Sequence, residues 1–87
     1  MSATGHGVMA DLAEKLALEL VRKHRRLVAK DDVEAAKILG RGRTWLWEQC
    51  RRQPGDPLRI NRTSGRQILF AELARYAQAA LNAGLTL

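Results

Sequence analysis

Hydrophobic residues between positions 8 and 26 recur every three or four residues, which is the spacing of one face of an α-helix. The stripe consists of Met9, Leu12, Leu16 and Leu20. Leu18 lies off this stripe, so we expect the helix to bury two faces. The basic run "RKHRR" closes the helix, where the helix dipole favours cations. Residues 1–7 precede the pattern and are predicted to form a disordered tail.

A second, shorter helix is predicted after a brief apolar segment. The run "LVA" at 27–29 is suited to a strand in a small sheet. Asp31 and Asp32 then supply an N-cap and a first-turn acid for a helix that ends at Gly40. Gly42 allows the chain to change direction sharply after that helix.

A third helix is predicted over about 43–52, with Leu46 and Cys50 on its inner face. Trp45 and Trp47 flank Leu46 and point about 200° apart on a helix with 3.6 residues per turn, so they cannot both be buried. We expect Trp47 to pack against the helix over 8–26 or against the hairpin that follows the third helix, because one large apolar side chain is usually buried in such a pair. Trp45 is then expected at the surface, at a ligand or a subunit contact.

The segment "PGDP" at 54–57 is the strongest breaker in the chain. After it, Leu58 and Ile60 alternate with polar residues, as in a half-buried strand. "RTSG" follows as a turn and "RQILF" as a second strand, which together predict a β-hairpin with an arginine on each side of its tip. "AELARYAQAALNAG" reads as the last helix. The expected fold is therefore α+β and mainly helical.

Composition limits the classes of protein that fit. A chain of 87 residues is one domain, close to the lower limit for a stable single core. The lone cysteine excludes an internal disulfide, and two widely spaced histidines argue against a structural zinc site. No apolar run spans a bilayer and no signal peptide is evident, so a cytoplasmic protein is expected. Spacings typical of catalytic or cofactor sites are absent from the sequence, which predicts a protein that is not an enzyme and needs no cofactor.

Positive charge is concentrated in one part of the chain. The net charge is +6, and the window 41–66 holds seven arginines against Glu48 and Asp56. Every basic residue in this window is arginine, whose planar fork suits phosphates and guanine edges. A solvated basic face is the plain alternative.

The predicted elements follow the order of a winged helix-turn-helix. Two helices are joined by a glycine turn, and a basic hairpin and a packing helix come after them. In such a module the first helix braces the second, which enters the major groove of DNA, and the hairpin lies over the backbone or the minor groove. The expected domain covers residues 27–84, with 8–26 as an additional N-terminal helix.

The same residues resemble a known family. "VEAAKILGRGRTWLWEQCRR" is similar to the "EAAxxLG" signature of the MerR-type winged-helix superfamily, in its branch of phage excisionases and AlpA-like regulators. "PLRINRTSGRQILFAELARYA" resembles the wing and following helix of that branch, and "LGRGRTWLWEQCR" also resembles the helix-turn-helix of phage antirepressor C-terminal domains. The resemblance covers roughly 27–81. It implies a DNA-binding transcriptional regulator or excisionase, with an integrase or RNA polymerase as a further partner.

The residues expected to contact DNA come from the glycine turn, the third helix and the hairpin. They are Arg41, Arg43, Thr44, Trp45, Glu48, Arg51, Arg52, Arg59, Arg62, Ser64 and Arg66. Arg43 and Thr44 start the helix, where free backbone N–H groups hold phosphate, although Thr44 also suits a helix start on its own. Glu48 fits either a cytosine amine or an ion pair with a neighbouring arginine. Arg62 and Arg66 flank the hairpin tip and are expected to contact phosphate or the minor groove.

Two alternatives stay open at the level of sequence. The basic face is also compatible with a protein-interaction module that docks an acidic partner. The apolar stripe of 8–26 can pack against its own domain or against the same helix of a second subunit. The two-faced pattern favours both uses together, and so a homodimer.

Overall fold

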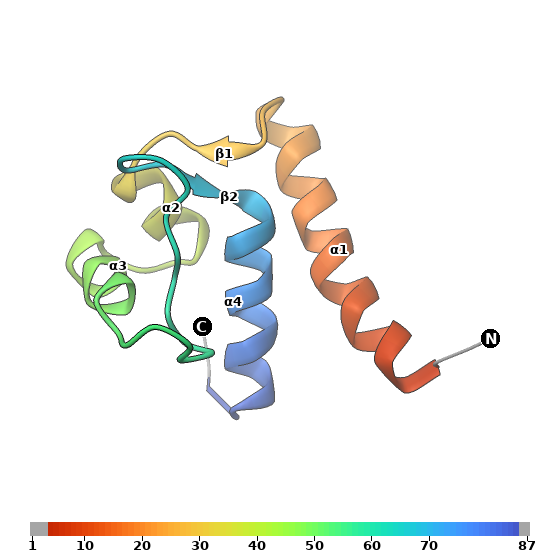
Figure 1. The fold of residues 1–87 in the computed structure, drawn as a ribbon. Coiled ribbons are helices and arrows are strands. Elements are labelled where there is room, and N and C mark those ends of the chain that lie inside the picture. Colours follow the sequence, from red (N-terminus) through yellow and green to blue (C-terminus); the bar gives the residue numbers. More distant parts are fainter. Residues whose placement is uncertain (1–3, 86–87) are drawn as a thin grey trace.

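The computed structural model describes residues 4–85, and the side chains of residues 12–85 among them. The chain is an α+β fold with mostly helical content (Figure 1). Its elements in order are α1 (Thr4–His24), β1 (Val28–Ala29), α2 (Asp32–Ile38), α3 (Arg43–Cys50), β2 (Ile68–Leu69) and α4 (Phe70–Asn82). Residues 4–7, predicted to belong to a disordered tail, lie in α1, which therefore begins before position 8. Residues 1–3 of that predicted tail and the side chain of Met9 lie outside the described part.

Helix α1 lies beside α4 (Figure 1). Leu20 is buried against the core, and Leu16 packs against it half-buried. Leu12, nearer the start of α1, is 53% exposed. Leu18 is also 53% exposed, so the second apolar face of α1 is not covered by the described residues of the same chain.

The small sheet joins two segments that are distant in sequence. Strand β1, expected from "LVA", pairs antiparallel with β2, with Val28 opposite Leu69 and Ala29 opposite Ile68. The predicted strand over Leu58 and Ile60 is wrong. Ile60 is instead held by its backbone N–H, which donates to the carbonyl of Gln49 in α3 at 3.2 Å.

The expected hairpin is reduced to a tight turn. Its one ladder contact in the described chain is an antiparallel bridge between Ser64 and Gln67. The N–H of Thr63 donates to the carbonyl of Gln67 at 2.9 Å, and Gly65 adopts a positive φ of 55° at the tip. Residues 62–66 therefore form a compact loop, without a paired strand on the side that precedes the turn.

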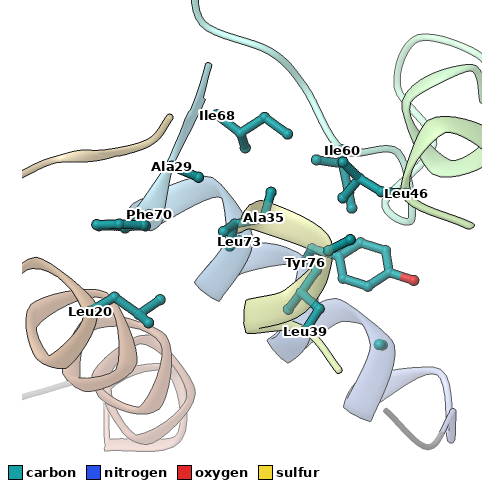
Figure 2. Close-up of a cluster of buried hydrophobic side chains, with 12 residues drawn as sticks. Leu20, Ala29, Ala35, Leu39, Leu46, Ile60, Ile68, Phe70, Leu73 and Tyr76 are labelled. Atoms are coloured by element: carbon teal, nitrogen blue, oxygen red, sulfur yellow. The ribbon is translucent and has the colours of Figure 1, made fainter. Parts of the chain in front are cut away.

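Side chains from all four helices and both strands form the core (Figure 2). Its largest fully buried side chains are Phe70, Leu46, Ile60, Ile68 and Leu73. Each contributes about 1.5–3 kcal/mol by leaving water. Ala35 and Ala36 are also buried, and their small size lets α2 approach its neighbours closely. Leu46 anchors α3 from its inner side, as the sequence pattern predicts.

The turn between α2 and α3 follows from local backbone chemistry. Asp31 is the N-cap of α2, and its carboxylate accepts from the N–H of Glu34 at 2.9 Å. Gly40 has a φ of 71°, and the N–H groups of Gly40 and Arg41 donate to the carbonyls of Lys37 and Ala36. This is the paired hydrogen-bond pattern with which helices commonly end at a left-handed glycine.

A charged cluster ties the end of α1 to the start of α2. Arg26 donates to both carboxylate oxygens of Glu34, with Nη2 2.6 Å from Oε2. The N–H of Lys30 donates to the same carboxylate at 2.8 Å. Chiefly through the hydrogen bonds from Arg26, the pKa of Glu34 is lowered from 4.5 to about 2. His24 completes the cluster, with Nδ1 3.8 Å from Oε2 of Glu34.

Candidate nucleic-acid interface

Helix α3 has one buried and one exposed face. Leu46 and Gln49 are buried against the rest of the molecule. On the exposed side, Arg43, Trp47 and the C-cap residue Arg51 follow one another at intervals of four residues, and all three are exposed. Residues at this spacing lie one above the other on a helix. The exposed face of α3 is therefore a stripe with an indole at its centre and an arginine one turn away on each side.

The expected burial of Trp47 is wrong, and the two tryptophans exchange roles. Trp47 is 53% exposed. Trp45 is half-buried and packs edge-on against Tyr76 of α4, with ring centroids 5.6 Å apart. The two indoles extend to opposite sides of Leu46, and α4 occupies the side of Trp45. Which of the two tryptophans is buried depends on where α4 packs against α3. The hydrophobic periodicity of α3 does not predict that position.

The start of α3 has no side-chain cap. Its N-cap residue is Gly42, so the N–H groups of the first turn receive no hydrogen bond acceptor from a capping side chain. Arg43 and Thr44 are exposed beside these N–H groups. Free N–H groups at the positive end of a helix dipole, next to a guanidinium and a hydroxyl, suit an anion such as phosphate.

An open groove of about 730 Å³ lies in front of this helix start. Four of its lining residues are predicted contacts from α3 and the loop 62–66: Arg43, Thr44, Arg62 and Arg66. The other four are Asp31, Asp32, Val33 and Trp47. The start of α3, the start of α2 and the loop 62–66 therefore meet around the groove. Three arginines and two aspartates line it.

Arg62 has a structural partner inside this groove. Its guanidinium donates to both carboxylate oxygens of Asp32, and the second of these bonds, from Nη2 to Oδ2, is 3.2 Å long. The hydrogen bonds with Asp32 raise the pKa of Arg62. The side chain of Asp32 is 13% exposed and that of Arg62 is 25% exposed. The pair ties the loop 62–66 to the first turn of α2.

Arg66 and Ser64 are the more accessible residues of the same loop. Both are exposed, and Arg66 lines the groove opposite the start of α3. Within residues 12–85, Arg66 makes no ion pair. Its guanidinium is therefore available to a ligand at the rim of the groove.

Three predicted contact residues hold the chain together away from the groove. Arg52 donates from Nε to Oε1 of Gln49 at 2.8 Å and from Nη1 to Asp56 at 3.2 Å. Arg59 donates to the carbonyl of Arg52 at 3.1 Å. These bonds stabilise the loop that follows α3. Arg41 places its guanidinium 5.4 Å from the ring centroid of Trp45.

Glu48 and Arg51 are exposed near the end of α3. The alternative in which Glu48 pairs with a neighbouring arginine is not formed in the described part of the chain. Arg51 lies over the ring of Trp47, at 5.1 Å from its centroid, and Arg52 pairs with Asp56. The carboxylate of Glu48 therefore points to solvent from the outer side of the helix.

Sequence reasoning missed Val33 and Trp47 as groove residues, and it treated Asp31 and Asp32 only as helix-start residues. Asp31 is indeed the N-cap, but Asp32 also holds Arg62. The contact between Asp32 and Arg62 spans thirty positions, so no local pattern predicts it. The repeat of Arg43, Trp47 and Arg51 was visible in the sequence and could have placed Trp47 outside.

Comparison of the chain with protein-family models, with curated proteins and with solved structures finds no match. Among the described residues, no helix is both long and apolar enough to cross a membrane.

Proposed function

We propose that this protein binds double-stranded DNA sequence-specifically, as a winged helix-turn-helix module with α3 in the major groove. The exposed stripe of Arg43, Trp47 and Arg51 carries the proposal. A helix with its side chains is about 10–12 Å wide and fits a major groove about 12 Å wide. Because Leu46 anchors the opposite face of α3, the stripe can enter the groove without loss of core contacts.

The start of α3 and the loop 62–66 are suited to the DNA backbone. The uncapped N–H groups of the first turn, together with Arg43 and Thr44, form a site for one phosphate. Arg66, on the other rim of the protein's own groove, reaches a second phosphate. Contacts of this kind fix the register of α3 on the duplex, and contacts from the stripe to base edges then supply specificity.

The charge distribution supports this arrangement. The window 41–66 carries a net charge of +5, whereas the remaining residues together carry +1. Asp31 and Asp32 lie close to the proposed interface, but Asp31 caps α2 and Asp32 is paired with Arg62. Their negative charge is therefore partly offset within the protein, and the arginines dominate the field that a duplex meets.

The family resemblance in 27–81 extends the proposal to a phage- or mobile-element-type regulator or excisionase. A regulator occupies one or two operators near a promoter and acts on RNA polymerase. An excisionase binds tandem sites and bends attachment-site DNA so that an integrase assembles on it. Footprinting for tandem occupancy, together with a gel assay for bending, separates these two roles.

A salt titration tests DNA binding itself. Gel shifts with random duplex are run at about 50 and 200 mM salt. The two phosphate contacts assigned above would lower the affinity about tenfold over this range. Selection from a random duplex pool then yields the preferred sequence. A protein that shows no salt-sensitive binding and no selected sequence contradicts the proposal and favours the alternative, an acidic protein partner docked on the basic face.

A further inference from the structure

From the position of Trp47 on α3, we infer that this residue selects thymine in the major groove by contacting its C5-methyl group. The inference rests on the proposed function and names the residue that reads a base. Trp47 is 53% exposed at the centre of a face that otherwise carries arginine, threonine and glutamate. A large aromatic side chain in such a position offers an apolar contact surface within a polar face.

The surroundings of Trp47 add to its apolar surface. Val33, at the start of α2, is 55% exposed and lines the same groove. The two side chains come from different helices and face one open space. Each offers a ligand in this groove an apolar surface, and Arg43 lines the same space.

Arg51 restricts how the indole can be used. Its guanidinium lies 5.1 Å from the centroid of the Trp47 ring, within the range of a cation–π contact. Because this contact covers one ring face, insertion between two base pairs or stacking between unpaired bases would first have to displace Arg51. The other face and the edge of the ring remain accessible, which suits a lateral contact with a base edge.

In the major groove, the C5-methyl group of thymine is the apolar feature that the bases present. Arginines that contact phosphates carry no sequence information. Asp31 and Asp32, which line the protein's own groove, already have partners within the protein. An apolar side chain on a helix in the major groove of DNA therefore discriminates in favour of thymine. The expected gain is that of burying one methyl group, which corresponds to about fourfold in affinity.

Replacement of thymine by deoxyuridine tests the inference, since it removes only the methyl group. The preferred duplex is first selected from a random pool with the wild-type protein. Each thymine in it is then replaced singly, and affinities are measured at one salt concentration. Wild-type protein should lose about fourfold at one thymine, or at two adjacent ones, and nothing elsewhere.

Variants assign the effect to Trp47. Trp47→Ala and Trp47→Gln should bind the thymine and deoxyuridine duplexes equally well, because the side chain that senses the methyl group is gone. Leu81→Ala is the matched control, since Leu81 is a 61% exposed apolar residue on α4, away from the groove. This variant should keep the wild-type discrimination. Circular dichroism confirms that each variant is folded.

Three results would overturn the inference while leaving DNA binding intact. They are a selected sequence without thymine, equal affinity for every deoxyuridine duplex, and Trp47 variants that still discriminate as wild type does. Tighter binding to single-stranded than to duplex DNA would instead point to base stacking on Trp47. Failure to bind any duplex would overturn the proposed function itself, and the inference with it.

Discussion

Arg62 and Arg66 belong to one short loop, yet their surroundings give them different roles. Arg62 donates both arms of its guanidinium to Asp32, whereas Arg66 is exposed at the rim of the groove. A paired and half-buried arginine positions the chain, while an exposed one can contact a phosphate. The sequence places both residues beside a turn and cannot distinguish them, because the partner of Arg62 lies thirty positions away.

Alanine substitutions should separate these two roles. Arg62→Ala leaves the largely buried Asp32 carboxylate without its partner and should lower the free energy of unfolding by about 1–2 kcal/mol. Arg66→Ala should change stability by less than about 0.5 kcal/mol. It should instead reduce the slope of log affinity against log salt by about one unit, one phosphate contact being lost. Urea unfolding and salt-dependent gel shifts measure the two effects. Equal stability losses in both variants would contradict the assignment.

Among elements, those defined by local chemistry were predictable. The caps of α2 and the glycine end of that helix follow from residues within one turn of each other, and so does the inward position of Leu46. The sheet was only partly predictable. Ile68 follows a turn and was expected to pair with the segment just before it, but its strand pairs with β1, nearly forty positions upstream. Pairing between distant segments depends on the packing of the helices between them, which periodicity does not encode.

The turn between α2 and α3 provides a test at the level of this element, because its two glycines differ in conformation. Gly40 has a φ of 71°, where a Cβ is strained, so Gly40→Ala should cost about 1–2 kcal/mol of stability. Gly42 has φ −88° and ψ 165°, which other residues adopt readily, and a Cβ there meets nothing within 4 Å. Gly42→Asp should therefore cap α3 and raise stability by a few tenths of a kcal/mol.

The same substitution should oppose DNA binding. The carboxylate of Gly42→Asp would occupy the N–H groups that we assign to a phosphate and would add a negative charge beside it. We expect affinity to fall at least about tenfold. Gly42→Ser is the control, since it supplies a cap without the charge, and should have a smaller effect. A Gly42→Asp protein that is stabilised and binds DNA as tightly as wild type would remove the start of α3 from the interface.

For the molecule as a whole, the cluster around Glu34 makes stability dependent on pH. The pKa of Glu34 is about 2 in the folded chain and near 4.5 when unfolded, so the stabilisation is complete above about pH 4.5. It is lost as the pH falls towards 2, because the unfolded chain takes up the proton first. Since Arg26 is 35% exposed, screening by solvent reduces the size of this contribution. Urea unfolding between pH 2 and 7 should show a smaller decrease below pH 4.5 for Glu34→Gln than for wild type.

The outer face of α1 decides how many copies of the chain act together. Leu20 faces the core, and Leu18 lies about 160° away from it around the helix. The side chain of Leu18 is 53% exposed. We expect this side to pair with the same helix of a second copy, which would present two α3 helices to half-sites about one helical turn of DNA apart. Sedimentation at micromolar concentration should then give about twice the chain mass of 9.7 kDa.

Two leucine substitutions on α1 separate assembly from folding. Leu18→Glu places a charge on the exposed side and should yield a folded monomer, because no contact of the core is lost. Leu20→Glu places the same charge at a site that is 9% exposed, so it should unfold the chain. A wild-type mass near 9.7 kDa would exclude a stable dimer. In that case α1 serves only the core of its own chain, and each α3 reads its site alone.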